Sequence, residues 1–210
     1  MKYICLLIFL ITHLFAFSQQ NDFIPIKNKH EIEQKLNNHS LKLNTIYSDF
    51  IQEKHLAYLN DIIISKGKFW FKKENQLRWE YNTPYKYIIA LNHGTFTIKD
   101  GDDIKEYDIN SNKAFQEVNN MIISSVRGTL LKDNKFTISL YQNKSSYLVK
   151  LIPKNKEMTK VLKAIELYFS KSDLNIFKVK MIENEDDYTV ISFTNKKINE
   201  TIPATIFNLN

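Results

Sequence analysis

The stretch GKFWFKKENQLRWEYNTPYKYIIAL, residues Gly67–Leu91, contains seven aromatic residues that alternate with Lys, Arg and Glu. Aromatic residues at a period of two are typical of β-strands that bury one face. Turn-forming residues at Lys73–Asn75 and Asn82–Pro84 divide the stretch into three short segments. The stretch therefore predicts an antiparallel meander with one strongly aromatic face.

The alternation also assigns side chains to faces. Phe69 and Phe71 share one face of their strand, with Lys68, Trp70 and Lys72 on the other. Leu77, Trp79 and Tyr81 share a face of the next strand, with Arg78 and Glu80 opposite. So many broad rings suit either a packed core or the wall of an apolar cavity. Composition leaves both interpretations open.

The two-residue period extends over most of the chain. We expect strands at Thr45–Ala57, Ile62–Lys73, Gln76–Tyr81, Lys86–Asn92, Thr95–Lys99, Ile104–Ile109, Lys135–Gln142, Ser146–Pro153, Lys163–Ser170, Asn175–Glu183 and Asp187–Thr194. Changes of phase at Ile176–Phe177 and at Val190–Ile191 predict β-bulges, which bend a sheet. We expect a mainly β fold: a curled or barrel-like antiparallel sheet with covering helices.

Helical spacing occurs in three places. Asn28–Leu43 carries Ile32, Leu36 and Leu43 roughly on one face, and a short helical turn is expected at Glu157–Leu162. Asn112–Leu131 predicts an amphipathic helix inserted between strands, with apolar residues Phe115, Val118, Met121, Ile122 and Val126. If the aromatic strands form a cavity, this helix is the candidate lid.

The N-terminus predicts export. A basic start is followed by the apolar run Tyr3–Phe17, which is short for a membrane span and ends in Ala16–Ser18, a small-x-small pattern. We expect a signal peptide at residues 1–18 and a single domain at 19–210. An uncleaved N-terminal anchor is the alternative. The only cysteine, Cys5, lies in this segment, so no disulfide is expected in the mature chain.

Charge and residue types argue against several functional classes. The net charge is +6, but 27 of the 29 basic residues are dispersed Lys, so nucleic-acid binding is not expected. The isolated His30, His39, His55 and His93 show no metal-ligand spacing. With four glycines and no nucleophile motif, we expect no catalytic residue, no metal and no cofactor.

Several segments together resemble the LolA family, periplasmic carriers of outer-membrane lipoproteins, in its Bacteroidetes form. The resemblance rests on Ser48–Lys54 (SDFIQEK), Ser65–Lys73 (SKGKFWFKK), Leu77–Tyr81 (LRWEY) with Pro84, Leu151–Lys154 (LIPK) and Asp187–Ile191 (DYTVI). It covers essentially the whole mature chain. The fold it implies is an open, incomplete antiparallel β-barrel with an apolar cavity and a helical lid.

The resemblance also implies a function and candidate sites. The cavity that binds lipoprotein acyl chains would include Phe50, Phe69, Phe71, Leu77, Trp79, Tyr81 and Ile89; the lid would carry Phe115, Val118, Met121, Ile122 and Val126. Where some members hold the lid with an Arg, the candidates here are Lys73 and Arg78.

The implied partners are acylated lipoproteins, an inner-membrane ABC-type release complex and an outer-membrane acceptor, with the carrier as a monomer in the periplasm. Two alternatives remain open: a periplasmic binder of another lipid, such as a phospholipid or a pigment-like lipid, and an adaptor that recruits a protein.

Overall fold

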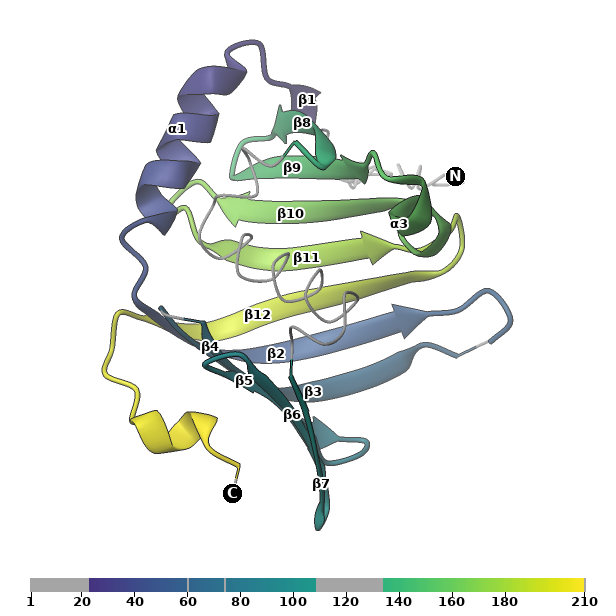
Figure 1. Cartoon of the computed structure of the whole chain (residues 1–210). Coiled ribbons are helices and arrows are strands. Elements are labelled where there is room, and N and C mark those ends of the chain that lie inside the picture. Colours follow the sequence, from purple (N-terminus) through teal and green to yellow (C-terminus); the bar gives the residue numbers. More distant parts are fainter. Residues whose placement is uncertain (1–22, 60, 74, 109–133, 210) are drawn as a thin grey trace, which may run out of the picture.

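The computed structural model describes residues 23–59, 61–73, 75–108 and 134–209 (Figure 1). Within these residues, twelve strands form one antiparallel sheet. The strands are β1 Ile24–Pro25, β2 Thr45–His55, β3 Ile63–Lys72, β4 Gln76–Thr83, β5 Tyr87–Asn92, β6 Thr95–Asp100, β7 Asp103–Asp108, β8 Phe136–Gln142, β9 Ser146–Pro153, β10 Ala164–Ser170, β11 Ile176–Ile182 and β12 Tyr188–Ile198. The predicted mainly β fold is confirmed.

The strand order is β1-β8-β9-β10-β11-β12-β2-β3-β4-β5-β6-β7. Apart from β1, which pairs with β8, each half of the order is a meander of sequence neighbours. The long β12–β2 ladder, from Tyr188–His55 to Ile198–Ile46, joins the halves. The order ends at β1 and β7, so the sheet is open. Figure 1 shows β8–β12 nearly face-on and β4–β7 nearly edge-on, which means that the sheet curls and has a concave face.

Three short helices accompany the sheet in the described residues: α1 Lys29–Ser40, α3 Lys156–Val161 and the 3-10 helix η3 Ala204–Phe207. The helix α1 runs beside one end of β8–β10 (Figure 1) and buries Leu36. The helix α3 begins where the Asn155 side chain accepts a hydrogen bond from the Glu157 backbone N–H (2.7 Å). The predicted helix Asn112–Leu131 lies outside the described residues.

Buried apolar residues form two clusters. The first joins α1 to β8–β10 and comprises Ile26, Leu36, Phe136, Leu140, Tyr147, Val149, Leu151, Ile165, Leu167 and Phe169. The second joins β2–β5 to β12 and comprises Phe50, Phe69, Phe71, Leu77, Tyr81, Leu91 and Ile191. Side chains from both clusters line one cavity on the concave face between them.

Gly67 of β3 is required by a close approach. A Cβ atom at this position would lie 1.9 Å from the Glu80 carbonyl oxygen and 2.8 Å from the Phe50 ring. Phe50 is the register partner of Gly67, so its ring lies over the glycine and is only 1% exposed. The missing side chain lets Phe50 pack under the aromatic residues of β4.

The predicted strands agree with the structure to within a few residues. The phase change at Ile176–Phe177 is confirmed, because Tyr168 pairs with Lys178 and Phe169 with Ile176. The predicted bulge at Val190–Ile191 is wrong. Those residues pair regularly with Glu53 and Gln52, and the irregularity in β12 falls between Thr194 and Lys197 instead. The strand also continues to Ile198, beyond the predicted end.

Candidate functional site: an apolar cavity on the concave face

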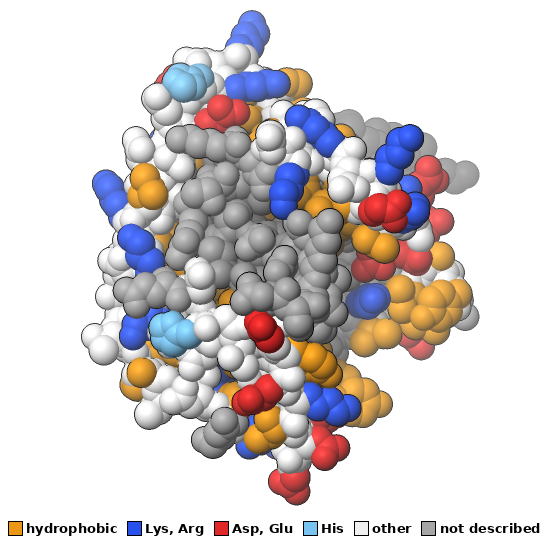
Figure 2. All heavy atoms as spheres, viewed as in Figure 1, with side chains coloured by type: hydrophobic (Ala, Val, Ile, Leu, Met, Phe, Trp, Pro, Cys, Tyr) orange, Lys and Arg blue, Asp and Glu red, His pale blue; other side chains and the backbone are white. Residues whose placement is uncertain are grey.

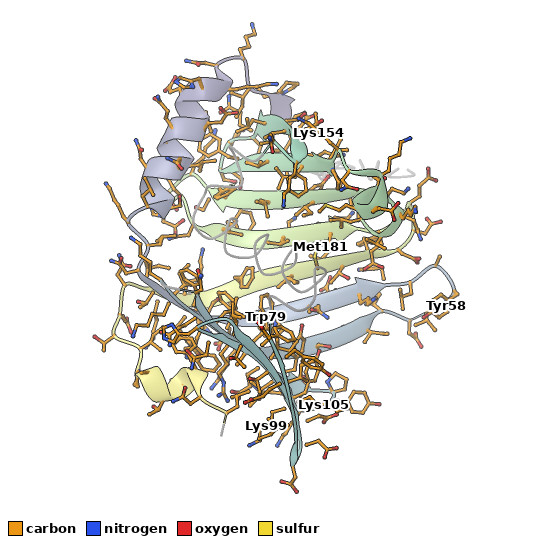
Figure 3. The ribbon with its side chains drawn as sticks, in the orientation of Figure 1. Tyr58, Trp79, Lys99, Lys105, Lys154 and Met181 are labelled. Atoms are coloured by element: carbon orange, nitrogen blue, oxygen red, sulfur yellow. The ribbon has the colours of Figure 1, made fainter. Side chains whose placement is uncertain are left out.

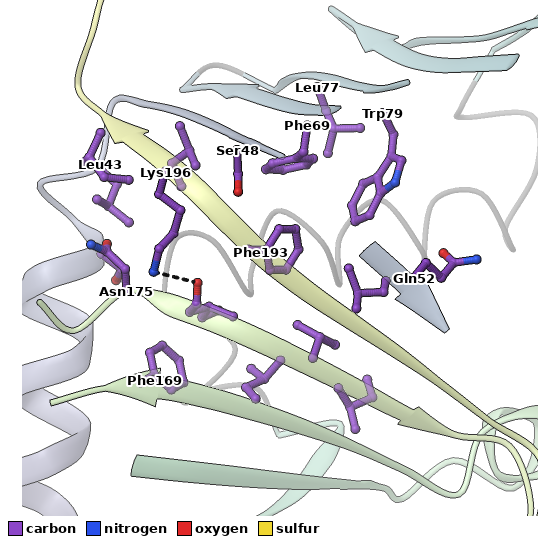
Figure 4. Close-up of a pocket in the computed structure, with 18 of the residues that line it drawn as sticks. Leu43, Ser48, Gln52, Phe69, Leu77, Trp79, Phe169, Asn175, Phe193 and Lys196 are labelled. Atoms are coloured by element: carbon purple, nitrogen blue, oxygen red, sulfur yellow. Dashed lines mark hydrogen bonds between the residues drawn. The ribbon is translucent and has the colours of Figure 1, made fainter. Parts of the chain in front are cut away.

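A cavity of about 430 Å³ opens on the concave face, between the two core clusters (Figure 4). Its described wall comes from the C-terminal half of α1, from β2–β6 on one side and from β10–β12 on the other. Most of the lining side chains are aliphatic or aromatic. Such a wall favours a ligand with extended apolar surface, because burying that surface removes it from water.

Aromatic rings form the β2–β4 side of the wall. The Trp79 indole lies 5.1 Å from the Phe50 ring and 4.9 Å from the Phe69 ring, measured between centroids. Its Nε1–H is buried and has no hydrogen-bond partner among the described residues. Because these rings pack against one another, they hold this part of the wall in one shape.

The structure places the predicted cavity residues in two layers. Phe69, Leu77, Trp79, Tyr81 and Ile89 line the cavity. Phe50 and Phe71 do not: they are 1% and 0% exposed and lie inside the second core cluster. The alternation placed Phe71 on the same face as Phe69, but it could not show how deeply Phe50 and Phe71 are buried. Lipid contact by the five lining residues stays a prediction.

The opposite side of the wall was not predicted as a site. It is mainly aliphatic and includes Ile165, Leu167, Val179, Met181 and Ile191, with Phe169 and Phe193 beside them. Figure 3 shows Met181 of β11 and Trp79 of β4 on the same concave side of the sheet. Ile165 and Leu167 alternate with Glu166 along β10, which indicates that they share one apolar face. Only the curl of the sheet shows that this face lies opposite the aromatic strands.

A few polar groups interrupt the apolar wall. The Tyr81 hydroxyl donates to Gln52 Oε1 (2.9 Å), and burial raises the pKa of Tyr81. The Ser48 hydroxyl donates to the Thr194 carbonyl (2.8 Å). Near the end of α1, His39 Nε2 donates to Asn175 Oδ1 (2.9 Å). These bonds pair the Tyr81, Ser48 and His39 side chains, so the surface of the wall stays mainly apolar.

Lys196 is the one lysine or arginine among the described residues that line the cavity. Its side chain is 18% exposed. The lysine was not predicted as a site residue, because without the bulge in β12 the alternation places it on the outer face. Figure 4 shows its amine directed towards β11, at the α1 end of the cavity.

The two candidates for holding a lid lie elsewhere. Arg78 faces away from the cavity, where it donates to Glu80 Oε2 (2.7 and 3.0 Å) and to the Ile206 carbonyl of η3 (3.0 Å). Its guanidinium also lies 5.6 Å from the Trp70 ring. Arg78 therefore fastens the C-terminal segment to the outer face, and its assignment to holding a lid stays a prediction. Lys73 is exposed in the turn after β3.

The proposed lid residues Phe115, Val118, Met121, Ile122 and Val126 lie outside the described residues, as does the segment 1–18. In the parts of the chain that the structure does describe, no cluster of His, Cys, Asp and Glu side chains could hold a metal ion. Nor does any helix there have the length and apolarity to span a membrane.

Charged side chains of both signs share the face of the molecule shown in Figure 2. On the face shown in Figure 2, Lys and Arg side chains are interspersed with Asp and Glu. This distribution is typical of a solvated surface and differs from the continuous basic stripe of a nucleic-acid interface.

The comparisons with known proteins agree with this geometry. The model of the family described as outer membrane lipoprotein carrier protein LolA matches residues 41–210. No curated protein matches the chain in sequence. Among solved structures, MucB is similar with 12% identity and a TM-score of 0.52, over 86% of this chain and 63% of that one.

Two further structures are similar. A conserved protein from Thermus thermophilus has 8% identity and a TM-score of 0.52, over 86% of this chain and 94% of that one. A LolA superfamily protein from Nitrosomonas europaea has 11% identity and a TM-score of 0.46, over 85% and 96%.

Proposed function

The chain belongs to the LolA family of outer membrane lipoprotein carrier proteins, and we propose that it is a periplasmic carrier that binds the acyl chains of lipoproteins in its concave cavity. The observation that carries the proposal is the cavity itself. A wall rich in aromatic side chains from β3 and β4 and a mainly aliphatic wall from β10–β12 enclose a space of about 430 Å³. A catalytic role is not part of the proposal.

The energetics of acyl chains explain why a carrier needs such a cavity. Each methylene moved from an apolar phase into water costs about 0.8 kcal/mol, so the chains of an acylated protein hold it firmly in a membrane. A carrier offsets this cost only if it offers a comparable apolar environment. The wall around Trp79, Phe69 and Leu167 supplies one.

The open sheet supports reversible loading. A closed barrel would bury its ligand completely, whereas an open edge lets the apolar face repack around ligands of different size. Met181 contributes to this adaptability, because its thioether side chain is flexible and polarizable. We propose that a helix within residues 112–131 covers the cavity and moves aside when a ligand is loaded. Its contacts with the cavity wall are then lost, and this loss lowers the net affinity for the acyl ligand.

The direction of transport is also part of the proposal. The chain would receive lipoproteins from an inner-membrane ABC-type release complex, because the sequence contains no nucleotide-binding motif that could supply work for loading. It would deliver them to an acceptor at the outer membrane. The N-terminal residues 1–18 would direct export and be removed.

Co-purification tests the function. The protein is isolated from its native periplasm under mild conditions, unfolded, and the released molecules are identified by mass spectrometry. Acylated peptides or intact lipoproteins are expected. Free phospholipid or another lipid alone would favour a lipid carrier of a different kind, and a protein partner without lipid would favour an adaptor.

A matched pair of variants links the result to the cavity. Val179→Trp places an indole in the space between the two walls, whereas Ile152→Trp places one on β9 at a position that is 41% exposed. The Val179 variant should lose the bound molecules and the Ile152 variant should keep them. Equal retention by both folded variants would mean that the ligand lies elsewhere.

A further inference from the structure

Trp79 brings a hydrogen-bond donor into the aromatic part of the cavity wall. Its indole lines the cavity, and the Nε1 atom is buried without a hydrogen-bond partner among the described residues. The described rings that pack against it, at centroid distances of 5.1, 4.9 and 6.1 Å, are those of Phe50, Phe69 and Phe193. A phenyl ring offers no lone pair to an N–H group, so these neighbours leave the donor unpaired.

A buried donor without a partner carries a cost that a ligand can remove. Almost all buried N–H groups in folded proteins are paired, because an unpaired group has lost its bonds to water and gained none in return. Among the side chains that the structure describes, Trp79 Nε1 is the one buried nitrogen or oxygen atom without a partner. An acceptor atom on a ligand in the cavity would therefore form a hydrogen bond that no described side chain makes.

The polar groups on this side of the cavity are neutral. The Tyr81 hydroxyl donates to Gln52 Oε1 (2.9 Å), so Gln52 presents its N–H donors to other partners. Figure 4 shows Trp79 and Gln52 on the side of the cavity away from α1, whereas Lys196 lies near α1. Among the described lining residues, the side near Trp79 therefore offers uncharged donors.

Uncharged donors favour an uncharged acceptor. An anionic oxygen buried beside Trp79 would have no described cation close to it, which is costly. A carbonyl oxygen accepts hydrogen bonds, carries no net charge and has no proton that needs an acceptor of its own. An acyl chain is by definition attached through a carbonyl group, in an ester or in an amide. The acceptor that the cavity lacks is thus part of the ligand's linkage.

From this arrangement we infer that Trp79 Nε1–H donates a hydrogen bond to the ester or amide carbonyl of a bound acyl chain, and that the cavity thereby prefers acyl ligands to ether-linked alkyl ligands of the same length. The inference rests on the proposed function, because the ligand occupies the same cavity. It adds a specificity-determining residue. The apolar wall, with Leu167 and Val179 opposite the aromatic rings, receives the hydrocarbon chain, and Trp79 recognises how that chain is linked.

Displacement of bis-ANS from the purified protein measures this preference. The probes are dioctanoylglycerol, whose chains are ester-linked, and dioctylglycerol, the ether analogue that has no carbonyl group. One neutral hydrogen bond predicts a dissociation constant that is about fivefold lower for the ester. Hydrophobicity alone predicts the reverse order, because the ether analogue is the less polar molecule.

The two tryptophans supply a matched pair of variants. Trp79→Phe removes the N–H donor and keeps an aromatic ring in the cavity wall. Trp70→Phe makes the same change on the outer face, where the Trp70 ring lies 5.5 Å from the Tyr47 ring. The Trp79 variant should bind the ester and the ether about equally, and the Trp70 variant should keep the wild-type preference. A preference that both variants keep, or that both lose, would contradict the inference.

The indole N–H signal provides a second measurement that requires no change at Trp79. The chain contains two tryptophans, so Trp70→Phe leaves the Trp79 signal alone in the indole region of a heteronuclear NMR spectrum. Dioctanoylglycerol should move this signal to higher frequency, because the N–H group gains an acceptor, and dioctylglycerol should move it much less. Equal movement with both ligands would mean that Trp79 Nε1–H does not bind the carbonyl oxygen.

The possible outcomes separate the two proposals. If the ester and the ether displace the dye from wild type with equal dissociation constants, Trp79 does not recognise the linkage, while the acyl cavity still stands. If neither ligand displaces the dye, the proposed function itself fails, and this inference with it. Should Trp79→Phe not fold, the NMR comparison of the two ligands decides the question alone.

Discussion

The rings of Trp79 in β4 and Phe193 in β12 lie 6.1 Å apart, although β2 and β3 separate their strands in the sheet. Three strand spacings of about 4.8 Å each would hold these positions much farther apart on a flat sheet. The curl of the sheet brings the two side chains together. The same curvature turns the aromatic face of the Gly67–Leu91 stretch into the wall of a cavity.

The two tryptophans should report differently on ligand binding. Trp79 lines the cavity, whereas Trp70 lies on the outer face, 5.5 Å from the Tyr47 ring and 5.6 Å from the Arg78 guanidinium. In Trp70→Phe, a triacylated lipopeptide should shift the emission of Trp79 to shorter wavelength. In Trp79→Phe, the emission of Trp70 should hardly change. Equal shifts in the two variants would show that the ligand is not in the cavity.

Gly67→Ala should destabilise the fold. The new Cβ atom would meet the Glu80 carbonyl oxygen and the Phe50 ring, so either the β3–β4 ladder or the aromatic cluster must shift. We expect a loss of about 2–3 kcal/mol in the free energy of unfolding, measured by urea denaturation.

Gly101→Asn is the control for that substitution. Gly101 has a φ of 59°, but a Cβ atom added there would meet no atom within 4 Å, and asparagine tolerates this backbone conformation. It should lose less than about 1 kcal/mol. Similar losses at both glycines would argue against the close approach of Phe50.

High pH should weaken the fold through buried phenols. Burial raises the pKa of Tyr81 above its usual 10.0, and burial with the nearby Asp49 raises the pKa of Tyr47 to about 12. Above about pH 10 the unfolded chain loses protons that the folded chain retains, so the free energy of unfolding falls as pH rises.

Urea denaturation at about pH 8 and about pH 11 measures this loss. Tyr81→Phe removes one buried phenol and should make the decline shallower, while it also removes the hydrogen bond to Gln52. A decline as steep as that of wild type would mean that Tyr81 does not contribute to it.

Arg78→Gln should loosen the C-terminal segment without affecting the cavity. It removes the ion pair with Glu80 and weakens the bond to the Ile206 carbonyl, which hold η3 against the outer face. Amide hydrogen exchange over residues 200–209 should become faster by about tenfold. Ligand affinity should stay within about twofold. If ligand affinity changes strongly while amide hydrogen exchange over residues 200–209 does not, Arg78 would instead act in holding a lid.

The sequence predicted the strands well because each strand carries its own local signal. The alternation of Leu77, Arg78 and Trp79 determines which side chains share a face, and His93-Gly94, a dipeptide that suits a tight turn, connects β5 to β6. Element types and short antiparallel connections follow from such patterns without reference to the rest of the chain.

The remaining features depend on contacts distant in sequence. The pairing of Ile24 with Gln142 joins segments that carry no shared pattern, and η3 is held by Arg78 from another part of the sheet. Phe50 is buried because Gly67 on the adjacent strand leaves room for its ring. Lys196 enters the cavity only because of a bulge whose position the sequence misplaced by several residues. The sequence therefore predicted the aromatic wall but not the charge within it.

Extraction of an acylated ligand from a membrane tests whether the cavity carries acyl chains. Vesicles that carry a triacylated lipopeptide are mixed with the purified protein and separated by flotation, and the lipopeptide in the soluble fraction is measured. Wild type should release the lipopeptide as a soluble complex, whereas Val179→Trp should release little and Ile152→Trp should behave as wild type. If folded wild-type protein leaves the lipopeptide in the vesicles and carries none in solution, the cavity is not an acyl-chain carrier site.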